Sequence, residues 1–194
     1  EPSEFFISYA KKYTDFPFLV LLDQKDGRYL PGRLLNAADM GREGRHVEFK
    51  QLLIDEKSGR VVIPNGTMGD RWDKTEKWNL RSEDSETGAA IEPQLSVLAT
   101  RDTVCIIELP YFGSEREVRS IERAVPAREI ETKDGRRYVA TVYDLVLANY
   151  GIDRGLGGEA ASSYEEVTPY TPKWQEKYTG VDAEIVIRTA REFA

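Results

Sequence analysis

The sequence has few residues of the kinds that build a self-contained metal or redox site. Among 194 residues it contains one cysteine, Cys105, and one histidine, His46. A zinc or redox-metal site requires several converging His, Cys or carboxylate ligands, so neither residue can anchor one alone. A Ser-His-Asp triad would have to use His46, and no GxSxG elbow is present to raise a serine. We therefore expect no metal ligand and no catalytic residue in this chain.

Packing and surface exposure explain these two residues better than chemistry does. Cys105 has no partner for an internal disulfide, and within "TVCIIEL" we expect it to pack as a small apolar side chain. The chain thus offers no disulfide argument for an oxidising compartment. His46 lies in "GREGRHVEF", a polar approach to an expected strand, so we expect its imidazole at the surface or rim.

A surplus of basic residues and a long apolar run are also missing. The formal net charge is -7, from 27 Lys and Arg against 34 Asp and Glu. Nucleic acid is therefore not an expected partner, because neutralising phosphates requires clustered cations. The longest apolar run, "FPFLVLL" at 16–22, is far shorter than the roughly 20 residues of a membrane helix. We expect a soluble chain with no direct membrane span.

Neither end of the sequence carries the signal of a natural terminus. The first residue is Glu1, and the last residues, "IRTAREFA", lie in an expected helix with no stop signal, so we expect a fragment. No internal repeat, low-complexity tract or Gly/Ser linker marks a firm boundary. We treat 1–194 as a single unit, with a hairpin-rich part at 15–140 and a helical part at 141–194 as the candidate division.

Turn signals between apolar stretches predict an α+β fold with antiparallel hairpins in the middle and helices on both sides. Asp26 and Gly27 reverse "PFLVLL" into "RYLPGRLL", and Asp134 and Gly135 stand at the turn of "REIETKDGRRYVATV". Between these hairpins, "CIIEL" predicts a buried strand that ends at Pro110.

A third hairpin is predicted where "VEFKQLLI" and "RVVI" flank "DEKSG". The alternation of Val47 and Phe49 with charged neighbours is typical of a half-exposed strand. The stretch 65–92 that follows is polar and rich in turn residues, and we expect a long excursion pinned by Trp72 and Trp78.

Two segments near the ends of the chain have the apolar spacing of amphipathic helices. The first follows an N-cap at Ser3 and places four aromatic residues on one face: Phe5, Phe6, Tyr9 and Tyr13. The second follows an N-cap at Asp182 and turns five residues inward: Ile185, Val186, Thr189, Ala190 and Phe193. If the chain folds alone, we expect these two faces to pair with each other or to drive self-association.

Helical spacing also predicts a helix over "VYDLVLANYG". The residues expected to share its inner face are Val142, Leu145, Val146 and Asn149. Gly151 stands where a left-handed C-terminal cap belongs. The sequence therefore predicts that this helix ends just before residue 151.

The glycine-rich corner "RGLGG" follows that helix and is a candidate phosphate site. It combines Arg154 with Gly155, Gly157 and Gly158, and backbone amides without side chains can cradle a pyrophosphate. A dinucleotide fingerprint, however, places its glycines between a strand and the start of a helix, whereas these glycines come after a helix. We therefore expect helix capping and loop closure here.

Two further patterns are better explained without a ligand. The first is an aromatic run interleaved with prolines: Tyr164, Tyr170, Trp174 and Tyr178. It could form a ligand platform, but prolines at a helix entry and aromatics covering a neighbouring element account for it equally well, and we expect packing. The second is the paired carboxylates of "SEDSE" and "YEEV", from which no glycosidase-type pair can be singled out among 34 acidic residues.

Seven segments, in order, resemble an internal stretch of the catalytic alpha subunit of respiratory nitrate reductase, a molybdopterin oxidoreductase. They are "YTDFPFLVLL", "GRYLPGRLLNAADM", "VIPNGTMGDRWDKTEKWNL", "LPYFGS", "ATVYDLVLANYGIDRGL", "SSYEEVTPYTPKWQEKYTGV" and "IRTAREFA". The similarity runs from about Tyr13 to Ala194. Its most specific parts are "NGTMGDRW", "KWNL" and "VYDLVLANYGIDRGL", because "TGV" before an "AREFA" helix is common to many molybdopterin oxidoreductases.

The resemblance implies a segment of a larger multidomain α/β molybdoenzyme. Such a parent carries bis(molybdopterin guanine dinucleotide) molybdenum and iron-sulfur clusters, and it reduces nitrate to nitrite with quinol-derived electrons. Its implied partners are the remainder of the alpha subunit, an iron-sulfur beta subunit and a membrane quinol-oxidising subunit, which would hold it at the cytoplasmic face of the membrane. In that family the iron-sulfur ligands and the molybdenum aspartate precede this stretch, and a glycine-rich loop with a histidine follows the "AREFA" helix. No catalytic residue carries over, and we expect the isolated chain to be inactive.

Other function classes stay open on the sequence. A related molybdenum enzyme could act on chlorate, perchlorate, selenate or a sulfide, because this stretch does not show the metal ligand and funnel residues that set substrate choice. A non-catalytic module could dock an electron-transfer subunit or an assembly chaperone through its acidic loops. An unrelated enzyme with "RGLGG" as its site would have to bind pyrophosphate or a nucleotide.

Overall fold

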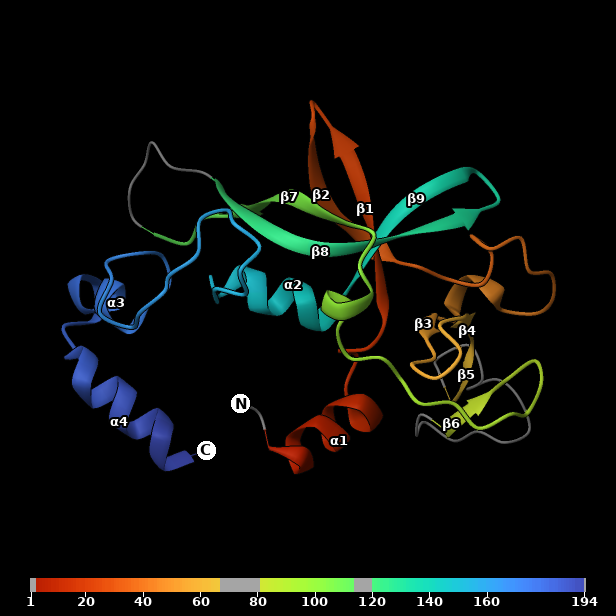
Figure 1. Ribbon diagram of the computed structural model, residues 1–194, viewed down its shortest axis with the longest axis horizontal. Helices are drawn as coiled ribbons and strands as arrows, with labels where there is room; N and C mark the ends of the chain where they lie inside the picture. The colour runs from red at the N-terminus through yellow and green to blue at the C-terminus, as the bar shows by residue number, and fades with distance from the viewer. Residues whose placement is uncertain (1–2, 67–80, 114–119, 194) are drawn as a thin grey trace.

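A closed five-stranded β-barrel forms the centre of the computed structural model, which describes residues 3–66, 81–113 and 120–193 (Figure 1). The strands follow one another around the barrel in the order β1 (Leu19–Lys25), β2 (Arg28–Leu34), β7 (Thr103–Pro110), β8 (Ser120–Thr132) and β9 (Gly135–Thr141). The helices are α1 (Glu4–Tyr13), α2 (Val142–Asn149), α3 (Pro172–Thr179) and α4 (Ala183–Phe193). The predicted α+β class, with antiparallel hairpins between helices, is confirmed.

The two hairpins that were predicted from Asp-Gly turns are both present in the barrel. Asp26 and Gly27 both have a left-handed φ, 50° and 79°, so the β1–β2 turn has the twist that matches the flanking strands. At the β8–β9 turn, Thr132 pairs with Gly135, whose φ is 103°. Strand β8 is longer than predicted, because it begins at Ser120 and pairs first with β7 and then with β9.

Closure of the barrel depends on a pairing that the sequence did not predict. Strands β2 and β7 run parallel and meet at Tyr29 and Ile107. The other four pairings around the barrel are antiparallel. Strands β2 and β7 are far apart in sequence, so no turn residues indicate that they pair. Each hairpin, in contrast, can be predicted from the residues of its turn.

The first four residues of β1, Leu19–Leu22, are buried on both sides, which explains their uninterrupted apolar sequence. Leu19 and Leu21 belong to a core that also contains Leu35, Ile54 and Val97. Leu22 belongs to a second core, made with residues of β7, β8, β9 and α2: Cys105, Ile107, Leu109, Ile121, Val125, Ala127, Ala140 and Ala148. Strand β1 therefore contributes side chains to both cores.

Two short hairpins lie beside the barrel, at the right in Figure 1. They pair β3 (Leu53–Ile54) with β4 (Val61–Val62), and β5 (Pro64–Asn65) with β6 (Arg81–Asp84). The third predicted hairpin is thus present, but the strand predicted at its start is wrong. Residues Val47–Phe49 form the 3-10 helix η1, because His46 before them has a left-handed φ of 59° that breaks an extended chain. The predicted anchors Trp72 and Trp78 lie outside the described residues.

Each predicted helix cap is found. The Ser3 side chain accepts a hydrogen bond from Phe6 N (3.2 Å), and the Asp182 carboxylate accepts one from Glu184 N (2.8 Å). Gly151, with a φ of 69°, closes the C-terminal end of α2. None of the described helices is long and apolar enough to cross a membrane.

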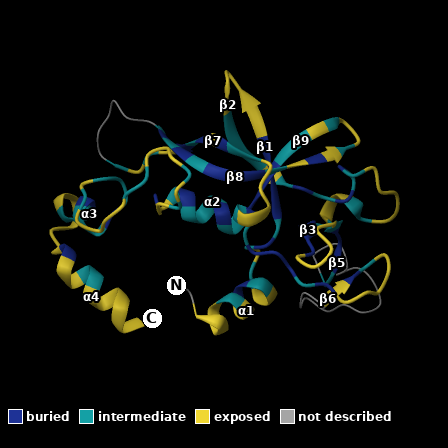
Figure 2. Cartoon of the chain, viewed as in Figure 1, coloured by how far each residue is buried: buried dark blue, intermediate teal, exposed yellow. Residues whose placement is uncertain are grey.

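The apolar faces of α1 and α4 are exposed and do not pair with each other (Figure 2), so self-association, the other expected outcome, stays a prediction. Phe5 is 79% exposed and Phe193 is 88% exposed, so these faces do not bury each other. Helix α1 contacts the rest of the molecule at Ala10, which is buried and lies one turn from Phe6. On α4, Ile185 is likewise exposed, and the one fully packed residue is Ala183 at its first position.

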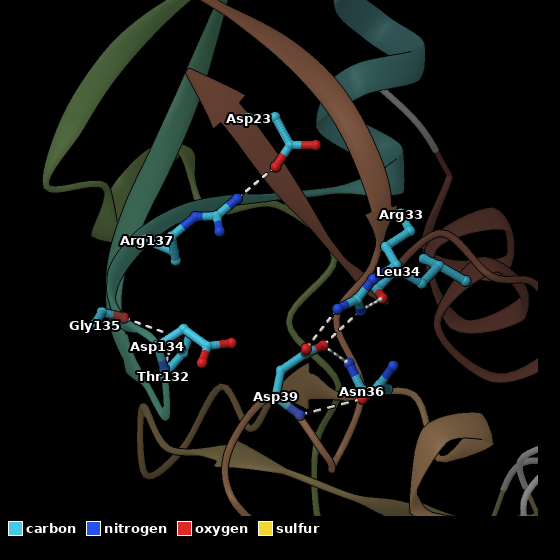
Figure 3. A network of polar contacts seen from close by, with 9 residues as sticks. All are labelled: Asp23, Arg33, Leu34, Asn36, Asp39, Thr132, Asp134, Gly135 and Arg137. Atoms are coloured by element: carbon cyan, nitrogen blue, oxygen red, sulfur yellow. Dashed lines mark hydrogen bonds and ion pairs between the residues drawn. The ribbon is translucent and has the colours of Figure 1, made fainter. Parts of the chain in front are cut away.

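Arg33, near the end of β2, forms an ion pair with Asp39 (Figure 3), whose backbone bonds to the β8–β9 turn. Arg33 Nη1 and Nη2 donate to Asp39 Oδ2 and Oδ1, each at 2.6 Å. Asp39 Oδ2 also accepts from Asn36 N (3.0 Å), and the Asp39 carbonyl accepts from Lys133 N at the β8–β9 turn (2.8 Å). The same carboxylate therefore caps its own turn and pairs with β2.

Replacing Asp39 with asparagine should remove an acid-sensitive part of the stability. The hydrogen bond from Arg33 holds the pKa of Asp39 below its usual value of 3.8. A carboxylate whose folded-state pKa is depressed stabilises the fold above the unfolded-state pKa, and this contribution disappears as the pH falls through the folded-state pKa. Asp39→Asn should lower the free energy of unfolding by about 1 kcal/mol at pH 7 and by less at pH 3. Urea unfolding measures both; an equal loss at the two pH values would contradict the account.

Candidate functional site

The most completely buried charge among the described residues belongs to Asp144, in the first turn of α2. Its Oδ1 accepts hydrogen bonds from Ser96 Oγ (2.6 Å) and Arg154 Nη1 (2.7 Å). Its Oδ2 accepts from Val97 N (2.9 Å) and Thr141 Oγ1 (2.8 Å). The Asp144 side chain is 0% exposed, so four donors replace the water that this carboxylate loses on burial.

The buried Asp144 corrects the predicted inner face of α2. Asp144 and Ala148 are the fully buried residues of this helix, which lies against β8 and β9. The residues expected there are only half-buried: Val142, Leu145, Val146 and Asn149. The spacing of apolar residues cannot reveal a carboxylate that points inward. The capping residues before the helix do give a signal for Asp144. Thr141 and Asp144 have the spacing of a capping box, and Thr141 Oγ1 accepts from Asp144 N (3.1 Å).

Arg154, the cation of "RGLGG", faces the interior. Its Nη2 donates to Ser96 Oγ (2.7 Å) while its Nη1 pairs with Asp144, and its side chain is 12% exposed. Gly155 N donates to Asp153 Oδ1 (2.9 Å), which closes the turn. The guanidinium and this amide already have partners, so the expected loop closure is confirmed for Arg154 and Gly155, whereas the cap of α2 is Gly151.

A second buried arginine, Arg123 of β8, holds the connection between α2 and α3. Its guanidinium donates to the carbonyl oxygens of Glu159 and Pro169, and the Glu159 carboxylate lies 3.9 Å from Nη1. Burial lowers the pKa of Arg123, and the charge of Glu159 opposes this effect. Sequence reasoning missed this residue, because an arginine in an alternating strand is expected to face water.

Packing against Arg123 and its strand explains two of the glycines. A Cβ on Gly158 would lie 2.8 Å from Ala124 N in β8, and a Cβ on Gly151 would lie 3.0 Å from Arg123 Nη2. Both glycines also have a left-handed φ, 76° and 69°. Close approach of the backbone to the barrel, rather than to a ligand, requires glycine at these positions.

The aromatic run packs mainly on itself and on the end of β7. Trp174 is edge-on to Tyr170 at a ring-centroid distance of 5.1 Å and lies 4.4 Å from the ring of Tyr178. Tyr170 Oη donates to the carbonyl of Pro110 (3.1 Å). The packing role is confirmed for these three aromatic residues, whereas Tyr164 is 61% exposed and does not share in it.

An open groove of about 640 Å³ lies between the end of α2 and the start of α3. Its walls include Tyr150, Ile152, Tyr164, Tyr170 and Pro172. The volume is within the range of small-molecule pockets, roughly 300–1,000 Å³. Asp153 is the one charged residue in its lining, so the groove brings together no pair of charged groups that could act as acid and base.

His46 and Cys105 belong to neither charged network and have the surroundings expected of them. His46 is half-buried at the start of η1, and its Nε2 accepts from Arg45 Nε (2.8 Å). Cys105 is 2% exposed in the barrel, and burial raises the pKa of its thiol to about 11. The thiol is therefore neutral at physiological pH and is not a nucleophile.

The sequence aligns along its entire length with relatives of known activity. It is 46% identical over 194 residues to the nitrate reductase alpha chain of Bacillus subtilis (strain 168). It is 42% identical over 207 residues to the respiratory nitrate reductase 1 alpha chain of Escherichia coli (strain K12). Both alignments cover 100% of this chain. The chain is homologous to one segment of the nitrate reductase alpha chains. The resemblance inferred from its motifs is confirmed.

The segment is a small part of these proteins. The chain spans 16% of the length of the two nitrate reductase alpha chains above. A third relative, the nitrate reductase alpha subunit of Mycobacterium tuberculosis (strain ATCC 25618 / H37Rv), is 39% identical over 98% of the chain, which spans 15% of that protein. No family model matches the chain.

Among residues 3–66, 81–113 and 120–193, no three His, Cys, Asp or Glu side chains gather as a metal site. A pyrophosphate would need free cations or amides, and the guanidinium groups of Arg123 and Arg154 both bond to the protein itself. The two buried arginines therefore hold the scaffold together.

Removing the carboxylate of Asp144 should strongly destabilise the chain. Asp144→Ala leaves Arg154 half-buried without its ion-pair partner and leaves Val97 N and two hydroxyls without an acceptor. We expect the free energy of unfolding to fall by about 3–5 kcal/mol, as measured by urea denaturation. The matched control is Asp153→Ala, an exposed aspartate nine residues along the chain, which should cost less than about 1 kcal/mol. Equal losses in the two variants would contradict the assigned role.

Proposed function

We propose that this chain is a structural segment of a respiratory nitrate reductase alpha subunit, an oxidoreductase that reduces nitrate to nitrite with quinol-derived electrons. The observation that carries the proposal is the identity of 39–46% with nitrate reductase alpha chains over 98–100% of the chain. Related molybdoenzymes for chlorate, perchlorate, selenate or a sulfide are the alternative, and the names of these relatives favour nitrate.

The proposed contribution of the segment is support rather than chemistry. In the parent, bis(molybdopterin guanine dinucleotide) molybdenum would supply the redox chemistry at nitrate, and iron-sulfur clusters would supply the electrons. Within the described residues, the buried charges Asp144, Arg154 and Arg123 are bonded to the protein itself, and they join the barrel to the loops around α2. This arrangement favours a rigid supporting segment. Its position would matter to the reaction, and its side chains would take no part in the chemistry.

The proposed partners follow from the same assignment. They are the remainder of the alpha subunit, an iron-sulfur beta subunit and a membrane quinol-oxidising subunit, which would place the enzyme at the cytoplasmic face of the membrane. A role in docking the beta subunit or an assembly chaperone is the second candidate, supported by the net charge of -7. Binding of a purified beta subunit to the chain alone would favour docking over pure support.

The isolated 194-residue chain is expected to be inactive. After expression in cells that make molybdenum cofactor, the purified chain should contain no molybdenum by elemental mass spectrometry. It should produce no nitrite from nitrate with reduced viologen as electron donor. The control is a full-length nitrate reductase alpha chain from the same cells. Stoichiometric molybdenum or nitrite production by the isolated chain would overturn the supporting role.

An exchange of segments tests the assignment to nitrate reductase. This chain replaces the homologous segment of the Escherichia coli alpha chain, and we expect the assembled enzyme to keep nitrate reduction, because the ligands of its metal centres are unchanged. The corresponding Bacillus subtilis segment serves as the matched control. An exchange carrying Asp144→Ala should yield less assembled enzyme. The proposal fails if the exchange enzyme assembles with molybdenum but is inactive while the control exchange is active.

A further inference from the structure

Helix α1 presents an uncovered aromatic face. Its four aromatic residues share one side of the helix, with exposures of 79, 40, 50 and 56%: Phe5, Phe6, Tyr9 and Tyr13. Three of them form a ladder, with ring centroids 6.3 Å apart for Phe5 and Tyr9 and 5.3 Å apart for Tyr9 and Tyr13. In Figure 2 this helix lies at the lower edge of the molecule with much of its surface exposed. An ordered row of exposed rings is typical of a contact surface.

Helix α1 is anchored beside its rings at Ala10 and opposite them at Lys11, so the helix cannot turn its rings inward. Ala10 is fully buried, and Lys11 Nζ donates to Glu56 Oε2 (2.6 Å) and to Glu92 Oε1 (2.8 Å). Thr14 Oγ1 donates to the carbonyl of Ala10 (2.6 Å) and fixes the end of the helix. Burying the rings against the barrel would break both ion pairs of Lys11.

We infer that a part of the same alpha chain, outside residues 1–194, packs on the aromatic face of α1. This inference rests on the proposed function. The chain spans 16% of the Bacillus subtilis and Escherichia coli relatives, and the alignment with the Bacillus subtilis protein covers 100% of the chain, α1 included. Most of the parent polypeptide is therefore available to cover this face.

The size of the face favours a contact within one polypeptide. A fully exposed aromatic side chain offers about 150–250 Å², so the four partly exposed rings offer roughly 450 Å². Each partner in a stable complex between separate proteins contributes about 800 Å². A second copy meeting through α1 alone would also lose translational and rotational freedom, whereas segments of one chain are already joined. The net charge of -7 opposes docking on an anionic membrane surface.

Photo-crosslinking in the full-length enzyme tests the inference directly. The photoreactive residue p-benzoylphenylalanine replaces Tyr9 in a full-length alpha chain that carries this segment, and the irradiated enzyme is digested and mapped by mass spectrometry. We expect crosslinks from position 9 to alpha-chain peptides outside the segment. The same substitution at Tyr13, one ring along the ladder, should reach the same region. The matched control is Tyr29 in β2, which should crosslink within the segment, near Tyr138, because their ring centroids are 5.8 Å apart.

The outcomes separate this inference from the proposed function. Crosslinks from Tyr9 to a second alpha chain, to the beta subunit or to lipid would overturn the inference, as would a Tyr9 site that reacts with no polypeptide while the Tyr29 control does. Nitrate reduction is assayed on the same preparation before irradiation. An active nitrate reductase without the expected crosslink refutes the contact alone, whereas the expected crosslink in an assembled enzyme that does not reduce nitrate refutes the assignment to nitrate reductase alone.

Discussion

The buried carboxylate of Asp144 is the interaction on which the arrangement of this segment depends. It joins three parts of the chain, because its four donors come from the end of β9, the segment before β7 and the loop after α2. A charge with no exposure is tolerated only when its hydrogen bonds are complete, so these three parts must meet in one geometry. Arg123 does the same for the connection from α2 to α3 through two carbonyl oxygens.

Local features of the fold could be predicted from the sequence, and long-range features could not. Asp26 and Gly27 specify a tight reversal through their own backbone preferences, and Gly151 specifies a helix end in the same way. The parallel contact of Tyr29 with Ile107 closes the barrel. It depends on the combined twist of five strands, so the sequence of neither strand predicts it. At Val47, alternation predicted a strand, and the left-handed backbone of His46 before it prevents one.

The same division holds for the candidate site. Prediction was sound for Cys105, which is packed in the barrel as expected. The expectation that one cysteine and one histidine make no metal centre stays a prediction. Prediction was incomplete for charged residues. Nothing in the sequence distinguishes the buried Asp144 and Arg123 from the many aspartates and arginines that face solvent. The aromatic face of α1 shows the opposite limit: the sequence predicted the shared face of Phe5 and Tyr9, but only the structure shows that this face is exposed.

The described residues thus pair their buried charges internally and leave apolar faces of α1 and α4 exposed. Amide hydrogen exchange at Val97 tests this account most directly, because Val97 N donates to the buried Asp144 Oδ2 at 2.9 Å although it belongs to no strand or helix. The account predicts that this amide exchanges as slowly as the paired amides of β8, through global unfolding. Exchange at the rate of an unprotected loop amide would show that the carboxylate does not hold these segments together.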